Sequence, residues 1–238
     1  MTEQQQAVYV PPKKKNVGLW FTAGLVVVIT VVAFVFAETP EPKPVADASL
    51  EPGLLGVADF PTGFSVANMT QAELDQLPTS KMPETVNPTE CSELVRDVKP
   101  AEESQSVAVV QASAAKHGLF YTQSVMRAGE VPEWDVARAE AMLDACAEMT
   151  FQFKGGRMAT LYARRVGGVA GEGYARTVST AENYGLGGFT LAGAVTKVDG
   201  HVVVFVGVAA FTMYGPTFNE VEFVRLANAA NDQVRSAL

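Results

Sequence analysis

The sequence predicts an α+β domain: an antiparallel twisted sheet of about six strands flanked by helices, with one disulfide, preceded by one transmembrane helix. Three observations support this fold class. An uncharged apolar run, Val17 to Ala37, precedes the part of the chain with a globular composition. Strand-like and helix-like segments then follow in mixed order, without the regular alternation of a parallel sheet. Both cysteines, Cys91 and Cys146, lie after the apolar run.

The apolar run has the length and the flanks of a membrane anchor. Its 21 residues contain no charge and no proline, and as a helix they would extend about 31 Å, close to the roughly 30 Å of a bilayer's hydrocarbon core. Lys13, Lys14 and Lys15 directly precede it, and Trp20 stands at its start. Because cations stay on the cytoplasmic side and aromatic rings favour the interface, residues 1–16 are expected to be a cytoplasmic tail.

A cleaved signal peptide ending at Ala37 is the alternative interpretation of the same run. Val35 and Ala37 are acceptable at a signal peptidase site. The run is longer than the usual signal core of about 7–15 residues, which favours an uncleaved anchor at residues 17–37.

Composition divides the rest of the chain into a linker and a domain. Residues 38–53 include four prolines and read as a semi-rigid linker, and residues 54–238 are expected to form the extracytoplasmic domain. Of the 18 cations and 26 anions in the chain, three cations and one anion precede residue 38, so the remainder carries a net charge of −10. Such a surface should repel nucleic acid, which excludes that class of partner.

Helices are predicted in four places. A capping-box pattern at Thr70 and Glu73 begins a short helix over 70–77, and Pro88 begins another over 87–95. A helix over 132–146 would present Cys146 at its end. The C-terminal helix should run from about Asn219 to Ser236, opened by a capping box at Thr217 and Glu220, with one face that would cover the sheet: Phe223, Ala227, Ala230 and Val234.

The strands are predicted from β-forming runs separated by turn residues. Residues 106–113 and 119–126 form an antiparallel pair. The run 201–211 is apolar at both odd and even positions, so it should lie in the middle of the sheet, covered on both faces. The remaining runs are punctuated by glycine and cover residues 149–153, 157–166, 174–180 and 191–198.

The two cysteines are expected to form a Cys91–Cys146 disulfide, because thiols outside the cytoplasm oxidise and stay oxidised. Closing a loop of this length would stabilise the fold by on the order of 4 kcal/mol before strain is subtracted. Two buried free thiols are the alternative.

A search for catalytic, cofactor and metal sites finds no pattern that supports one. His117 and His201 have no acid or cysteine at metal-ligand spacing, and Glu102 with Glu103 reads as an exposed charged loop. The glycines of residues 167–173 lack the Lys-Ser/Thr of a phosphate loop and indicate a hairpin turn. Arg164 and Arg165 should point to opposite faces of one strand, so at most one could serve an anionic ligand. No enzyme activity, cofactor or metal is therefore expected.

Three segments resemble a known family: residues 58–65 (ADFPTGFS), 86–91 (VNPTEC) and 146–150 (CAEMT). They are similar to the extracytoplasmic sensor-type domains of actinobacteria, found in mycobacterial PknH-like kinases and related envelope proteins. The resemblance spans roughly residues 54–238 and implies a twisted antiparallel sheet flanked by helices, a disulfide from a Pro-x-x-Cys segment to a later helix end, and a cleft of unknown ligand. Those kinase domains carry two disulfides, whereas this chain has two cysteines.

Three functions remain open from the sequence. The first is a non-catalytic accessory module that docks on a larger membrane or envelope protein complex; actinobacterial respiratory supercomplexes resemble a suitable host because they carry small single-pass subunits with external domains. The second is a receptor for a small ligand or envelope lipid in a cleft between sheet and helix. The third is a hydrolase, which no residue pattern supports.

Overall fold

The computed structural model describes residues 44–75, 85–91, 105–114, 118–131, 141, 144–153, 157–180, 189–210 and 218–238. The expected cytoplasmic tail, Lys13, Lys14, Lys15, Trp20 and the 17–37 helix lie outside these residues, as do His117, Glu102 and Glu103. Among the helices of the described ranges, none is long and apolar enough to cross a membrane.

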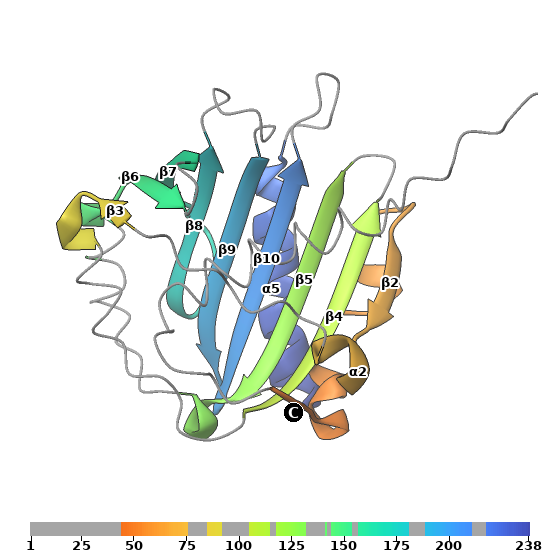
Figure 1. The fold of residues 1–238 in the computed structure, drawn as a ribbon. Coiled ribbons are helices and arrows are strands. Elements are labelled where there is room, and N and C mark those ends of the chain that lie inside the picture. The colour runs from red at the N-terminus through yellow and green to blue at the C-terminus, as the bar shows by residue number, and fades with distance from the viewer. Residues whose placement is uncertain are drawn as a thin grey trace, which may run out of the picture.

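A ten-stranded sheet forms the body of the molecule (Figure 1). Nine of its strands follow one another in the order β1-β4-β5-β10-β9-β8-β7-β6-β3. The tenth, β2, pairs with β4 beside β1. The pairs are antiparallel except β1 with β4. The strands are β1 (Val45–Ala46), β2 (Ser65–Asn68), β3 (Thr85–Asn87), β4 (Ser106–Ala114), β5 (Leu119–Arg127), β6 (Glu148–Phe153), β7 (Arg157–Arg165), β8 (Glu172–Thr180), β9 (Phe189–Val198) and β10 (His201–Ala210).

The expectation of about six strands was wrong, because the sheet has ten. The unexpected strands β1, β2 and β3 are two to four residues long. Such short segments carry no alternating pattern, and they are strands only because β4 or β6 offers an edge with free hydrogen-bonding groups. The prediction of a mixed helix and sheet fold is confirmed.

Helices lie on both faces of the sheet. The long helix α5 (Glu220–Ala237) packs across one face, called here the α5 face. The short helix α2 (Gln71–Leu74) lies against the other face, where its Leu74 packs on Val107 and Val109 of β4. The 3-10 turns η1 (Ala48–Gly53), η2 (Val57–Asp59) and η4 (Ala128–Glu130) complete the described elements.

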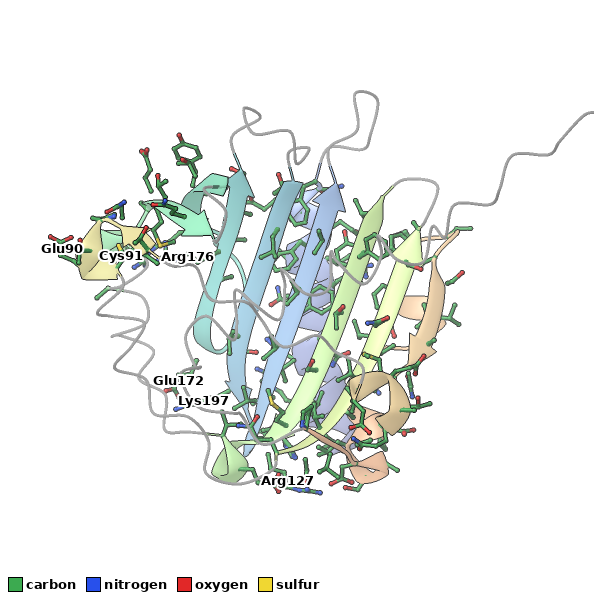
Figure 2. The ribbon with its side chains drawn as sticks, viewed as in Figure 1. Glu90, Cys91, Arg127, Glu172, Arg176 and Lys197 are labelled. Atoms are coloured by element: carbon green, nitrogen blue, oxygen red, sulfur yellow. A yellow bond between two sulfur atoms is a disulfide. The ribbon has the colours of Figure 1, made fainter. Side chains whose placement is uncertain are left out.

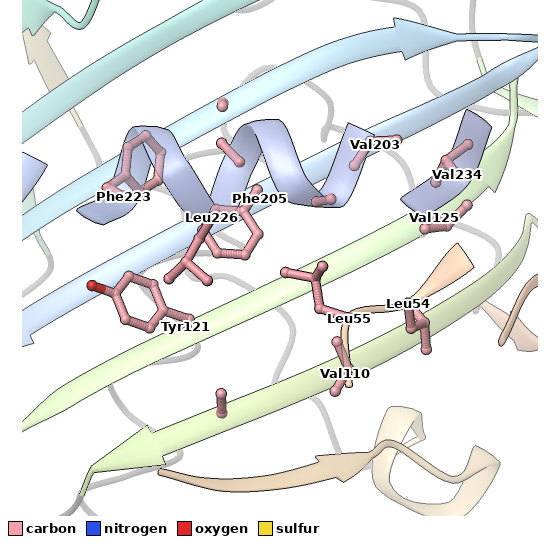
Figure 3. Close-up of a cluster of buried hydrophobic side chains, with 14 of the residues drawn as sticks. Leu54, Leu55, Val110, Tyr121, Val125, Val203, Phe205, Phe223, Leu226 and Val234 are labelled. Carbon is pink, nitrogen blue, oxygen red and sulfur yellow. The ribbon is translucent and has the colours of Figure 1, made fainter. Parts of the chain in front are cut away.

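Strand β10 lies between β5 and β9 and is buried on both faces, which confirms its prediction as a central strand. Val203 and Phe205 face α5, and Val204 belongs to a separate cluster on the opposite face. Figure 3 shows the α5 side of this core, where the rings of Phe205 and Phe223 lie 5.6 Å apart. The four helix residues expected to cover the sheet are all buried: Phe223, Ala227, Ala230 and Val234.

Helix starts agree with the sequence at α2 and differ at α5. Thr70 and Glu73 form the expected capping box. At α5 the cap is Asn219, whose side chain accepts a hydrogen bond from the backbone N–H of Glu222, and not Thr217 with Glu220. In the helix expected over 87–95, Asn87 belongs to β3 and residues 89–91 are helical, while 92–95 lie outside the described residues. The helix expected over 132–146 lies largely outside the described residues, and residues 144–145 are helical.

The folded domain begins earlier than the expected linker boundary at residue 53. Val45 and Ala46 pair with β4, and Leu50 is 2% exposed in the core beside α5. The side chain of Gln123 on β5 is fully buried and binds the end of this segment. It accepts a hydrogen bond from the N–H of Leu55 at 2.7 Å and donates one to the carbonyl of Gly53 at 2.8 Å. Residues 45–53 are therefore part of the domain.

Candidate functional site

On the α5 face, the helix packs on β9 and β10, and strands β6 to β8 lie to one side of it (Figure 1). Three successive register pairs align one residue from each strand: Glu148 with Tyr162, Tyr162 with Ser179, and Ser179 with Thr190. Because paired residues point to the same side of a sheet, these four side chains form one row across about 14 Å.

Arg164 places this row on the α5 face. It stands two residues from Tyr162 on β7, so both side chains point to the same side. Its guanidinium Nη2 donates to the carboxylate of Glu220 in the first turn of α5. We call Glu148, Tyr162, Arg164, Ser179 and Thr190 the polar shelf.

The polar shelf is accessible to solvent. The Arg164 side chain is 64% exposed and Tyr162 is 44% exposed. Glu148 is also exposed, while Ser179 and Thr190 are half-buried. Beside the row, the hydroxyls of Thr150 and Thr160 share a hydrogen bond of 3.1 Å. The shelf thus offers an aromatic ring, hydroxyls and charged groups for non-covalent binding, and none of its five residues is a histidine or cysteine.

Arg165 points to the opposite face, as the sequence predicts for neighbours on a strand. It lies directly across from Arg176 of β8, and both arginines bind Asp144. The Asp144 carboxylate accepts at 2.8 Å from Nη2 of each arginine. These hydrogen bonds lower the pKa of Asp144 below its usual 3.8, and the bond from Arg165 has the largest effect. The two arginines are therefore occupied by a carboxylate of the same chain at the surface of the sheet.

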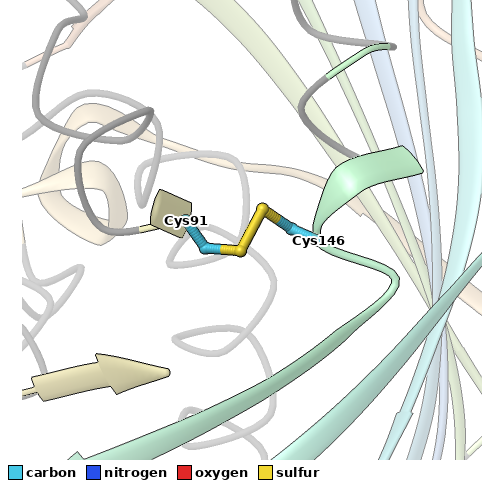
Figure 4. The surroundings of a disulfide bond; sticks show 2 residues. All are labelled: Cys91 and Cys146. Carbon is cyan, nitrogen blue, oxygen red and sulfur yellow. A yellow bond between two sulfur atoms is a disulfide. The ribbon is translucent and has the colours of Figure 1, made fainter. Parts of the chain in front are cut away.

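The Cys91–Cys146 disulfide is present, as predicted, next to this ion cluster (Figures 2 and 4). Both cysteines are buried, and Cys146 follows Asp144 by two residues. The bond joins the segment after β3 to the segment before β6, and these are the outermost strands at that edge of the sheet. It therefore supports the part of the sheet that carries the polar shelf.

The glycine-rich stretch at residues 167–173 forms the loop between β7 and β8 and the first two residues of β8, in agreement with the expected hairpin. Two asparagines of α5 form hydrogen bonds with this loop. Asn228 accepts from the N–H of Ala170 at 2.7 Å and donates to the carbonyl of Gly168 at 2.9 Å. Asn231 donates to the carbonyl of Ala170 and accepts from the hydroxyl of Thr196. These bonds use the loop's polar groups for internal contacts.

The interface between α5 and the sheet is filled with side chains in the described part of the chain. One polar group there is notable: the buried hydroxyl of Tyr121 has no hydrogen-bond partner among the described residues. Burial, followed by the charge of Glu222, raises the pKa of Tyr121 to about 12, so the hydroxyl is neutral at physiological pH.

The described residues offer no evidence for a metal site or for a catalytic histidine. There, no group of three or more His, Cys, Asp and Glu side chains is placed to hold a metal ion. His201 begins β10 with its Nδ1 3.1 Å from the carbonyl oxygen of Asp199, which is a strand-end contact.

Sequence reasoning singled out Arg164 and Arg165 but missed Glu148, Tyr162, Ser179 and Thr190. Alternation within each strand could have assigned faces to these residues. Their alignment depends on the register of four strands, which a single sequence does not specify.

Comparison with known proteins identifies the fold and no family. No protein-family model matches the chain, and no curated protein matches it. The fold is similar to the X-ray structure of an uncharacterized protein (Rv0999 ortholog) from Mycobacterium smegmatis, with 16% identity and a TM-score of 0.50, covering 75% of this chain and 92% of that chain. The crystal structure of the extracellular domain of PknH from Mycobacterium tuberculosis gives 14% identity and a TM-score of 0.47, covering 81% and 98%.

Proposed function

We propose that the chain is a non-catalytic, single-pass extracytoplasmic binding or accessory module of the cell membrane. Residues 17–37 would anchor it with the N-terminus in the cytoplasm, and the domain would dock on a larger membrane or envelope protein complex. An actinobacterial respiratory supercomplex is one complex of the right kind. The polar shelf is the observation that carries the proposal.

The shelf has the composition of a protein interface. Tyrosine and arginine are enriched at the energetically dominant positions of interfaces, and the shelf exposes both Tyr162 and Arg164. The underlying sheet is rigid because each strand from β7 to β9 is paired on both edges. A rigid surface loses little entropy on binding, which favours docking.

The disulfide supports an extracytoplasmic location for the domain. Disulfides form and persist in oxidising compartments and are rare in the cytosol. The Cys91–Cys146 bond therefore agrees with an anchor that holds its positive flank inside and the domain outside.

Affinity purification from native membranes in mild detergent tests the proposal. The full-length chain should recover a discrete protein complex, and the double variant Tyr162→Ala/Arg164→Ala should reduce recovery at least tenfold, because truncating interface tyrosines and arginines costs about 1–2 kcal/mol or more each. The matched control is Val57→Ala/Arg235→Ala, which truncates exposed side chains away from the shelf. A wild-type chain that always purifies alone, or equal recovery by both variants, would contradict docking through the shelf.

A receptor for a small ligand or envelope lipid is the second candidate, and Tyr121 is the observation that favours it. A buried hydroxyl without a partner costs about 1–3 kcal/mol, so a ligand that bonds to it would gain affinity. Native mass spectrometry of the full chain released from membranes should then show a bound small molecule that Tyr121→Phe loses. Mass spectra of the bare chain would exclude this candidate.

A further inference from the structure

The domain has two distinct ends, and the chain enters at one of them. Val45 pairs with Ser106 at the start of β4, and this is the end where Figure 1 places the C-terminus. The end of α5 lies there too, because Gln233 donates to the carbonyl of Pro52 at 2.8 Å. Figure 2 shows Arg127 and Lys197 at the same end. We call this end the base of the domain.

The polar shelf lies at the other end. Strand β9 begins next to the shelf residue Thr190 and runs to Val198 at the base. Eight residue steps of a strand cover about 27 Å. The shelf is therefore separated from the base by nearly the full length of the sheet.

The tether from the expected anchor is shorter than the sheet. Only residues 38–43 separate Ala37 from Pro44, because residues 45–53 are folded onto the domain. The seven steps from Ala37 to Pro44 can extend to at most about 25 Å. Since this reach is less than about 27 Å, the domain cannot invert to stand on its shelf end while its base remains joined to the tether.

The charge of the shelf selects among partners. Glu148 is exposed, and Glu220 pairs with the single cation of the shelf, Arg164, so these three described residues carry one more anion than cation. The chain beyond residue 37 is also acidic as a whole, with a net charge of −10. A basic protein surface complements this arrangement.

We propose that the domain stands with its base toward the bilayer and binds, through the polar shelf, a basic extracytoplasmic domain of another membrane protein. In this upright orientation the contact lies about 27 Å or more from the membrane surface, beyond the reach of short loops between transmembrane helices. This inference rests on the proposed anchor and docking function and adds the orientation and the kind of partner.

Photo-crosslinking in native membranes tests the orientation. The full chain would carry p-benzoylphenylalanine at Tyr162 on the shelf or at Glu51, an exposed residue of η1 at the base. The Tyr162 probe should capture a protein whose crosslinked peptide lies in an extracytoplasmic domain, and the Glu51 probe should capture lipid or membrane-embedded peptides. Capture of lipid or a membrane-spanning peptide from Tyr162 would overturn the orientation while preserving docking. Capture of no protein from either position would overturn docking itself.

Glu148→Gln tests the charge of the partner. In the Tyr162 probe background, this substitution should reduce crosslinking several-fold at low ionic strength, and the difference should shrink as salt is added. Asp232→Asn, which removes an exposed carboxylate from the far part of α5, is the matched control and should leave the yield unchanged. Equal yields with and without Glu148 would overturn a basic partner.

Discussion

The Nε2 of Gln123 donates a hydrogen bond to the carbonyl oxygen of Gly53 across 2.8 Å, in a site where the glutamine is fully buried. Its Oε1 accepts from the N–H of Leu55 in the same segment. One side chain in the middle of β5 therefore satisfies two backbone groups of the segment that enters the domain. Through this contact, residues that resemble a linker become part of the core.

Gln123→Leu should lower the free energy of unfolding by about 2–5 kcal/mol, because it leaves the N–H of Leu55 and the carbonyl of Gly53 buried without partners. Thermal unfolding of the full chain in detergent measures the effect. Gln233→Leu is the matched control: it removes a bond to the same segment at Pro52, but at an exposed position, and should change stability by less than about 0.5 kcal/mol. Similar losses in both variants would contradict the role of burial.

Gly207→Ala should destabilise the domain by about 1–3 kcal/mol through overpacking. A Cβ at Gly207 would lie 2.8 Å from Cε1 of Tyr121 and 3.0 Å from Cε2 of Phe218. Gly193 on the neighbouring strand β9 provides the control, since a Cβ there meets no atom of the described residues within 4 Å. Chemical unfolding should separate the two alanine variants, and equal stability would show that the aromatic rings move aside freely.

The contribution of Asp144 to the stability of the fold should decrease as the pH falls. Its pKa is lowered in the folded protein by hydrogen bonds from Arg165 and Arg176, so its stabilising effect is present above the ordinary value of 3.8 and is lost as pH falls through the lower folded value. Melting temperatures of the wild type and Asp144→Asn, measured from pH 7 to pH 3, should differ most above about pH 5 and converge in acid. A difference that stays constant down to pH 3 would contradict this assignment.

Removal of the disulfide should loosen one edge of the sheet more than its centre. The double variant Cys91→Ala/Cys146→Ala loses a cross-link worth at most on the order of 4 kcal/mol. Hydrogen exchange should become faster in β6, next to Cys146, while β10 keeps its protection because it is covered on both faces. Uniform loss of protection across both strands would show that the bond stabilises the whole domain instead.

Local patterns predicted most of the regular elements. The β-forming runs of β4 and β5, the two-sided apolar pattern of β10 and the apolar stripe of α5 are each visible in one continuous stretch of sequence, and each was confirmed. The short strands β1 to β3 were missed, since a segment of two to four residues has too few side chains to show a period. The capping residue of α5 was misplaced by two positions, a usual error at helix ends.

By itself, the sequence determined the helix and sheet composition, the central position of residues 201–211, the Cys91–Cys146 pairing and the opposite orientations of Arg164 and Arg165. Most of these features depend on residues that are close in the chain. The disulfide pairing follows because the chain has two cysteines. Only the tertiary structure decided that Glu148, Tyr162, Ser179 and Thr190 form one row and that residues 45–53 belong to the domain. The physical reason is that strand register and the burial of Gln123 are properties of segments far apart in sequence, which meet only when the sheet is assembled.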